Sequence, residues 1–196
     1  KINSKQLPTQ STADILRFET KRLKHIVNEL LEFDHISSGQ LRYKWQDVNI
    51  LDVLKKSIIN FKSVNPAYKV LVENTIPRGM STIQADPEKL QQVFSNILNN
   101  SAKFSAPHIP IIVKLELHKK TLTISITDYG KGIKKIDQRK IFNEFYKAEG
   151  NMKDGLGLGL YLVRRIIEKH KGKIDLSSKI RQGTNITIEL PLRLYD

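Results

Sequence analysis

The sequence predicts an α/β fold, a two-layer sandwich in which one mixed β-sheet is covered on one face by three helices. A further helix precedes this unit. Segments with a helical period of apolar residues alternate along the chain with segments in which apolar and polar residues alternate, as in half-buried strands. Two pairs of the strand-like segments are joined by short turns, as in hairpins. The composition, 39% hydrophobic and 27% charged, is typical of a globular chain with a buried core.

The first predicted element is a helix over about residues 12–36. Its apolar residues step by seven, three, four and three, which is an a/d-type seam. The seam is formed by Leu16, Leu23, Ile26, Leu30 and Phe33. Ser37-Ser38-Gly39 ends the helix. We expect the seam to pack against partner helices. The alternative, packing on the chain's own core, is disfavoured because a complete sheet domain follows separately.

The remaining elements follow in order, and the chain is expected to divide into residues 1–45 and residues 46–196. Residues 43–49 form a short linker or an edge strand. Helices are predicted over 50–61, with Leu51, Leu54, Ile58 and Phe61 inward, and from 87 onward, with Asp86 as N-cap and Pro87 at N1. Strands are predicted over 70–74 and 82–85, and hairpins over 111–128 and 173–190, the second with Gly183 at its turn.

Length and composition limit the function classes. The 196 residues suffice for one domain plus an appendage. The absence of cysteine excludes disulfides and thiolate metal sites, and no apolar run reaches the length of a membrane span. No signal peptide is visible. Because the chain begins with Lys1 rather than Met, we expect a fragment of a longer protein, from which a membrane sensor region could have been cut away.

The net charge of +13 would suit nucleic acid or an anionic membrane surface. The lysines scatter over the chain, however, with no basic stripe interleaved with aromatic residues. One group lies around the two glycine-rich segments described next: Lys131, Lys134, Lys135, Arg139, Lys140, Lys147 and Lys153. A polyphosphate ligand accounts for that group at least as well as DNA does. We therefore expect no nucleic-acid partner.

The first glycine-rich segment is Asp128-Tyr129-Gly130-Lys131-Gly132, which follows a predicted strand whose residues Leu122, Ile124 and Ile126 face inward. An ionised carboxylate only accepts hydrogen bonds. In a pocket, Asp128 can therefore accept from the exocyclic amine of adenine, whereas guanine presents an oxygen there and would be rejected. Taken alone, the segment is read better as a hairpin turn.

In the second glycine-rich segment Gly155, Gly157 and Gly159 alternate with leucines and lead into a helix. The stripe of that helix comprises Leu158, Leu162, Ile166 and His170. Free backbone N–H groups at a helix N-terminus favour phosphate. No Gly-Lys-Ser/Thr follows, so the segment is not a P-loop. A flexible linker is the alternative, but a linker would not alternate with leucine.

The third segment is the predicted helix over 90–104. Asn96, Asn100 and Lys103 recur at four and three residues and so share one face, away from the apolar stripe. An amide oxygen can ligate Mg²⁺ that also bridges phosphates, and a lysine can contact a phosphate as a point charge. A solvated polar face is the alternative, and it suits Asn99 better than the other asparagines.

Together these segments resemble the catalytic and ATP-binding domain of a two-component sensor histidine kinase, which has the Bergerat ATPase fold. Residues 96–104 resemble the N box, 128–132 the first glycine box, 142–146 the F box and 155–160 the second glycine box, and Gly183-Thr184 resembles the last glycine motif. All occur in the order of the family and cover most of residues 47–196. The first predicted helix resembles the second helix of the dimerisation bundle.

The resemblance implies transfer of the ATP γ-phosphoryl to a histidine, then to an aspartate of a response-regulator receiver domain, with Mg²⁺ as cofactor and a homodimer through the bundle. Asn96, Asn100 and Lys103 are the implied catalytic residues, with Mg²⁺ on Asn100. The implied ATP contacts are Asn96, Asn100, Lys103, Phe104, Asp128, Gly130, Gly132, Ile133, Phe145, Lys147, Gly155, Leu156, Gly157, Leu158, Gly159, Leu160 and Thr184. The F box would anchor a lid over about residues 133–154. This region is expected in the cytoplasm, with any membrane anchor outside it.

Some residues depart from the pattern of the family. Gln92 stands where many relatives have His, Lys147 where many have Arg, Leu156 where Ser or Thr is usual, and Lys171 interrupts a common His-Gly-Gly. These departures bear on the efficiency of transfer more than on ATP binding.

The phosphoacceptor histidine of the family precedes an acidic residue on the first bundle helix, and that motif occurs nowhere in this chain. We therefore expect that the acceptor lies on a helix missing from this chain, which alone cannot phosphorylate itself. Two alternatives stay open. One is another Bergerat ATPase, such as an anti-sigma-type serine kinase or a chaperone or topoisomerase ATPase. The other is an ATP-binding regulatory or phosphatase module without kinase activity.

Overall fold

The sheet at the centre of the molecule has the strand order β2-β4-β5-β7-β6. The computed structural model describes residues 10–38, 42–148 and 155–192. The strands are β2 (Val70–Asn74), β4 (Ile111–His118), β5 (Thr121–Asp128), β6 (Lys173–Lys179) and β7 (Gly183–Pro191). β2 and β4 run parallel, and the other neighbours are antiparallel, which makes the sheet mixed. Both predicted hairpins, β4–β5 and β6–β7, are therefore confirmed.

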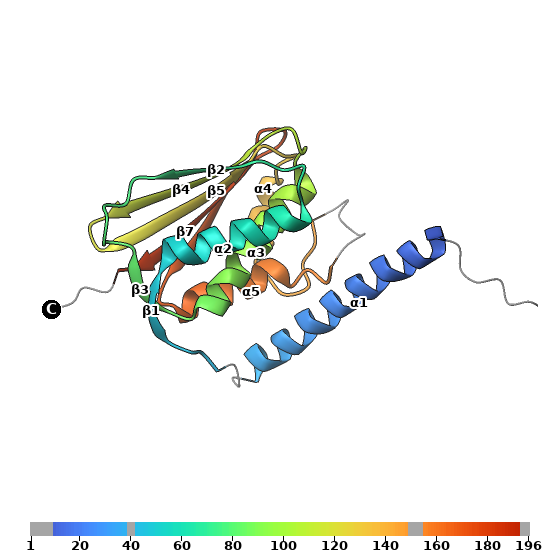
Figure 1. Cartoon of the computed structure of the whole chain (residues 1–196), viewed down its shortest axis with the longest axis horizontal. Coiled ribbons are helices and arrows are strands. Elements are labelled where there is room, and N and C mark those ends of the chain that lie inside the picture. Colours follow the sequence, from blue (N-terminus) through green and yellow to red (C-terminus); the bar gives the residue numbers. More distant parts are fainter. Residues whose placement is uncertain (1–9, 39–41, 149–154, 193–196) are drawn as a thin grey trace, which may run out of the picture.

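Three helices cover one face of this sheet, as Figure 1 shows: α2 (Ile50–Val64), α3 (Pro87–Phe104) and α5 (Gly159–Lys169). The core lies between the two layers. On the sheet side it contains the inward residues predicted for β5, Leu122, Ile124 and Ile126, all fully buried. The predicted two-layer arrangement of a mixed sheet and three helices is confirmed.

α2 presents a wider apolar face than the sequence suggested. Val53 is buried beside Leu54 and Ile58, whereas the predicted inward residue Leu51 only packs partly against the core. With 3.6 residues per turn, the buried stripe is centred between these positions and places Leu51 at its margin. α2 also continues three residues beyond the predicted end.

α3 begins as its sequence predicts. Oδ1 of the N-cap Asp86 accepts hydrogen bonds from the backbone N–H groups of Glu88 (2.9 Å) and Lys89 (3.1 Å), and Pro87 stands in the first turn. The apolar stripe of α3 is buried in the core. The opposite, polar face of α3 therefore points away from this core.

Residues 46–49, whose structure the sequence left open, form strand β1 (Gln46–Asn49). β1 pairs antiparallel with β3 (Thr82–Ala85) in a separate two-stranded sheet. A short helix that the sequence did not predict, α4 (Lys135–Gln138), follows the first glycine-rich segment.

α1 (Gln10–Ser37) lies beside the α/β unit (Figure 1). Most of its seam is exposed: Leu23 is 62% and Leu30 43% accessible. At its C-terminal end, the Phe33 ring instead contacts Phe145 and Tyr161, with centroids 5.1 and 5.8 Å apart. The contact with the chain's own α/β unit that the sequence disfavoured is thus present at one end of the helix. Within the residues that the structure describes, no helix combines the length and apolarity that a membrane crossing requires.

Candidate functional site

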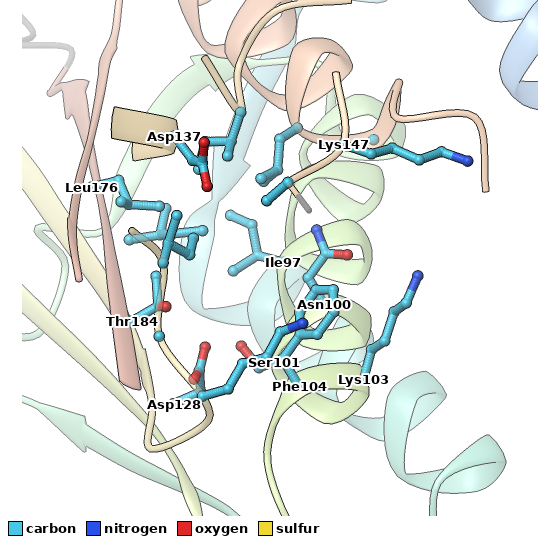
Figure 2. A pocket seen from close by; sticks show the side chains of 18 of the residues that line it. Ile97, Asn100, Ser101, Lys103, Phe104, Asp128, Asp137, Lys147, Leu176 and Thr184 are labelled. Carbon is cyan, nitrogen blue, oxygen red and sulfur yellow. The ribbon is translucent and has the colours of Figure 1, made fainter. Parts of the chain in front are cut away.

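A cavity of about 580 Å³ lies between α3 and the sheet, and we call it the central cavity. Its walls come from α3, from the ends of β5, β6 and β7, from the segment between β5 and α4, and from the segment that leads into α5. In Figure 2, Asp128, Ser101 and Thr184 lie together at one end, while Lys103 and Lys147 lie on the opposite side. The cavity thus joins an end with a buried carboxylate to a basic side.

Asp128 occupies the carboxylate end and is 8% exposed. Its Oδ1 accepts a hydrogen bond from the backbone N–H of Gly130 at 2.9 Å. Burial raises the pKa of this carboxyl above its usual value, and the hydrogen bonds from Gly130, Thr184 and Ser101 act in the opposite direction. Register places Thr184 of β7 opposite Asp128. A desolvated acceptor of this kind is suited to a ligand that donates from an amino group.

The glycines after Asp128 let the chain pass close to other backbone. Gly132 has φ +70°, and a β-carbon there would lie 2.1 Å from the carbonyl oxygen of Lys179. Gly132 and Ile133 line the cavity. Gly130, a predicted contact, does not line it; it packs against the backbone of Phe104.

The polar face of α3 borders the cavity through Asn96, Asn100 and Lys103, the residues predicted to share one face. Asn96 Nδ2 donates to the carbonyl oxygen of Gly159 at 3.4 Å, which links α3 to the start of α5. The Nζ atoms of Lys103 and Lys131 lie 5.4 and 4.8 Å from the centre of the Phe104 ring. These lysines are therefore held by an aromatic wall at the basic side.

The second glycine-rich segment lines the cavity through Gly155, Gly157, Gly159 and Leu160. Gly157 has φ +79°, and a β-carbon there would lie 2.7 Å from the carbonyl oxygen of Tyr146. The segment therefore runs directly against the end of residues 142–146, which resemble the F box, and it leads into the N-terminus of α5. Backbone N–H groups at this position favour an anion.

Three further predicted contacts, like Gly130, do not line the cavity. Leu158 is fully buried, whereas Leu160 of the same segment lines the cavity. Leu156 points its backbone N–H toward Glu29 of α1. Phe145 has φ +56° and turns its ring outward onto Phe33. Phe104, Lys147 and Thr184 do line the cavity. Residues 149–154 of the expected lid lie outside the described residues.

Several lining residues are not among the contacts predicted from the sequence, among them Glu29, Ser101, Asp137 and Tyr146. Asp137 is buried in the four-residue helix α4 and accepts a hydrogen bond from the Tyr146 hydroxyl at 2.7 Å. This hydrogen bond joins α4 to Tyr146, nine positions further along the chain. A helix so short carries no periodicity to predict it, although Tyr146 itself belongs to residues 142–146, which resemble the F box. No signal in the sequence pointed to Glu29.

Among the described residues, no group of three or more His, Cys, Asp or Glu could hold a metal ion by itself. The oxygen donors at the basic side include the amides of Asn96 and Asn100 together with the Glu29 carboxylate. Such a sparse set suits a hard cation that keeps water and takes further oxygens from a bound anion.

Residues 85–194 match the family described as Histidine kinase-, DNA gyrase B-, and HSP90-like ATPase. The chain is 30% identical over 192 residues to sensor protein RprX of Bacteroides fragilis, covering 95% of this chain and 37% of that protein. It is 29% identical over 180 residues to sensor histidine kinase WalK of Bacillus subtilis, with coverages of 89% and 29%. The chain thus spans about a third of the length of these relatives.

Solved structures agree with this result. The mycobacterial sensor histidine kinase MprB superposes with a TM-score of 0.67 at 25% identity, over 78% of this chain and 100% of that one. Histidine kinase AdeS of Acinetobacter baumannii gives 0.77 at 21% identity over 98% and 89%, which bears on the fold alone. The chain therefore belongs to the histidine kinase-, DNA gyrase B- and HSP90-like ATPase family, and its relatives include the sensor histidine kinases WalK and MprB.

Proposed function

We propose that this chain is the ATP-binding catalytic part of a sensor histidine kinase, which transfers the γ-phosphoryl of ATP to a histidine outside the chain. The observation that carries the proposal is the polarity of the central cavity. A buried carboxylate at one end is matched by lysines, asparagine amides and a glycine-rich helix start at the other. This distribution complements a nucleotide, whose base offers donors and whose phosphates carry charge.

At the carboxylate end, Asp128 accepts from the exocyclic amine of adenine. Thr184 lies beside it and holds a water on the base side. Ser101 contributes a hydroxyl that already hydrogen-bonds to the carboxyl. Guanine would turn an oxygen toward the Asp128 carboxylate and leave a buried charge without a donor, which is strongly unfavourable.

At the basic side, Lys103 and Lys147 attract the phosphates and the backbone N–H groups of residues 155–159 cradle them. Asn100 ligates Mg²⁺, with Asn96 in support. When bound there, Mg²⁺ neutralises charge on the phosphate oxygens. Phosphoryl transfer depends mainly on positioning and charge stabilisation, and the residues of this chain supply the positioning.

The acceptor nitrogen belongs to a histidine on a helix outside this chain. ADP leaves as the γ-phosphoryl group moves to this nitrogen. An aspartate of a response regulator receives the group next. Residues 1–45 then form the end of the dimerisation region and residues 46–196 the catalytic domain. The exposed leucines of α1 support a homodimer through a helical bundle. Any membrane anchor lies in other segments, with this region in the cytoplasm.

Titration calorimetry with Mg·ATP and with Mg·GTP tests the nucleotide assignment. We expect saturable binding of ATP and markedly weaker binding of GTP. Equal affinities would contradict the assignment of Asp128 to the base.

The Mg²⁺ assignment is tested with Asn100→Ala. Since the variant lacks the ligand oxygen, ATP should raise its melting temperature equally with and without Mg²⁺, whereas the wild type should gain more from Mg·ATP. Asn60→Ala, on the exposed face of α2, is the matched control. A larger shift with Mg·ATP in Asn100→Ala would refute the role.

A further inference from the structure

The C-terminal part of α1 enters the central cavity through Glu29. This side chain is 9% exposed although α1 lies outside the α/β unit. Its Oε2 accepts the backbone N–H of Leu156 at 3.4 Å. A β-carbon placed on Gly155 would lie 3.9 Å from Oε2, and one placed on Gly159 would lie 3.8 Å from Oε1. The carboxylate therefore lies in the segment to which we assign the phosphates.

Two neighbouring side chains anchor the face of α1 that carries Glu29 to the α/β unit. Glu32 forms an ion pair with Lys89 of α3 at 2.6 Å, in which the two side chains are only 16% and 20% exposed. Glu32 also accepts a hydrogen bond from Gln92. Phe33 packs against the rings described above. Since positions 29, 32 and 33 follow the i, i+3, i+4 spacing, one face of α1 docks as a unit.

A carboxylate and a phosphate bind to the same hydrogen-bond donors of this segment. Both are anions that accept from backbone N–H groups at the start of a helix, where the helix dipole favours negative charge. The two cannot share the segment, because like charges at contact distance repel in a cavity that screens them poorly. From these contacts we infer that Glu29 is an intramolecular stand-in for nucleotide phosphate, so that docking of α1 and binding of a triphosphate oppose each other.

The inference rests on the proposed nucleotide function and adds a regulatory consequence to it. Coupling between two binding events is reciprocal. If docked α1 lowers the affinity for ATP by some factor, bound ATP loosens α1 by the same factor. Release would free the face of α1 that carries Glu29, Glu32 and Phe33, in addition to the leucines that are already exposed.

A second role for Glu29 would have the opposite effect. Asn96 lies on the same side of Gly159 as the carboxylate, since a β-carbon on Gly159 would also lie 3.9 Å from Asn96 Cγ. Glu29 could therefore ligate Mg²⁺ together with the amides. Competition is favoured because Glu29 takes the N–H of Leu156, a donor that a phosphate would use.

Calorimetry on Glu29→Gln separates the two roles. We expect Mg·ATP to bind about tenfold more tightly than to the wild type, which corresponds to one charge-assisted contact. Adenosine, which has no phosphate, should bind equally to both proteins. Glu19→Gln makes the same change in charge on an exposed part of α1 and should match the wild type. Phe33→Ala, which loosens the docking but keeps Glu29, should also tighten ATP binding.

Unchanged ATP affinity in both Glu29→Gln and Phe33→Ala would overturn the inference while leaving nucleotide binding intact. Weaker Mg·ATP binding by Glu29→Gln would overturn it in favour of the Mg²⁺ ligand. If the wild type and the variants bound neither ATP nor adenosine, the proposed function itself would fail, and this inference with it.

Release of α1 is measured directly by spin labels. The chain has no native cysteine, so Lys24→Cys on α1 and Lys169→Cys on α5, both exposed, accept a label pair. Saturating ATP should broaden and lengthen the distance distribution between the labels, whereas adenosine should leave it unchanged. An identical distribution with saturating ATP would show that α1 stays docked and would overturn the inference.

Discussion

At the scale of one residue, Asp128 is a binding group whose burial lowers the stability of the fold. Its folded-state pKa is raised by burial. A carboxyl with a raised pKa contributes most below its unfolded pKa, and that contribution is lost as the pH rises through the folded value. Ionisation of Asp128 therefore lowers the free energy of unfolding, which an asparagine of the same shape would not do.

We accordingly expect Asp128→Asn to weaken ATP binding by about 2 kcal/mol, roughly thirtyfold, through loss of a charge-assisted hydrogen bond. Its free energy of unfolding at pH 7 should equal or exceed that of the wild type. Calorimetry and urea denaturation measure the two quantities. Asp175→Asn, at an exposed position of β6, is the control and should change neither. Unaltered ATP affinity in Asp128→Asn would remove Asp128 from the base site.

At the scale of the elements, the first turn of α3 joins three parts of the chain. The backbone N–H of Asp86 donates a hydrogen bond to Nε2 of His170 at the end of α5 (3.0 Å). The Asp86 side chain accepts, through Oδ2, a hydrogen bond from the backbone N–H of Lys44 (2.8 Å). Because Oδ1 also caps α3, one buried side chain positions the helix that carries the asparagine face.

Asp86→Ala should lower the free energy of unfolding by about 2 kcal/mol or more, since it removes the cap and leaves the Lys44 N–H without its partner. Asn49→Ala removes the side-chain cap of α2, at an exposed site where water can replace it. The loss there should be about 1 kcal/mol or less. Urea denaturation of both variants provides the comparison, and equal losses would contradict this view of the α3 junction.

His170 makes the same junction sensitive to pH. It is 4% exposed, its Nε2 accepts the Asp86 N–H, and its Nδ1 therefore carries the proton and donates to the Ile166 carbonyl oxygen at 2.8 Å. Burial lowers the pKa of His170 below its usual value of about 6.5. Since the unfolded chain then binds a proton at a higher pH than the folded one, stability is full above the unfolded pKa and falls as the pH drops toward the folded pKa.

Urea denaturation between pH 7.5 and 5.5 should show this loss in the wild type. His170→Gln does not titrate in this range, and its free energy of unfolding should fall less over the same interval. If both proteins lost stability in parallel, the pH dependence would belong to other groups.

At the scale of the whole molecule, none of the four histidines whose side chains the structure describes lines the central cavity. His35, His108 and His118 are exposed on other surfaces, and both ring nitrogens of His170 are engaged. A phosphoryl acceptor must reach the γ-phosphate at near-attack distance.

We therefore expect no acid-labile label when this chain is incubated with γ-labelled ATP. Label should appear when a helix that carries a phosphoacceptor histidine is joined upstream of Lys1. Acid-labile label on the chain alone that disappeared in His108→Gln would show that the acceptor lies within it.

The sequence alone determined the features that depend on local order. Periodicity predicted the strands of both hairpins and the asparagine face of α3, and cap chemistry placed the start of α3 at Asp86. Asp128 and the glycine-rich segments were found because turns and close backbone approaches require particular residues within a few positions.

Tertiary structure alone decided which distant residues meet. Glu29 and Leu156 are 127 positions apart, and no period relates them. Phe145 contacts Phe33 of α1, 112 positions away, and does not line the cavity. Leu158 entered the core although its neighbours line the cavity. Such contacts follow from the packing of whole elements against one another, and local residue patterns carry no record of that packing.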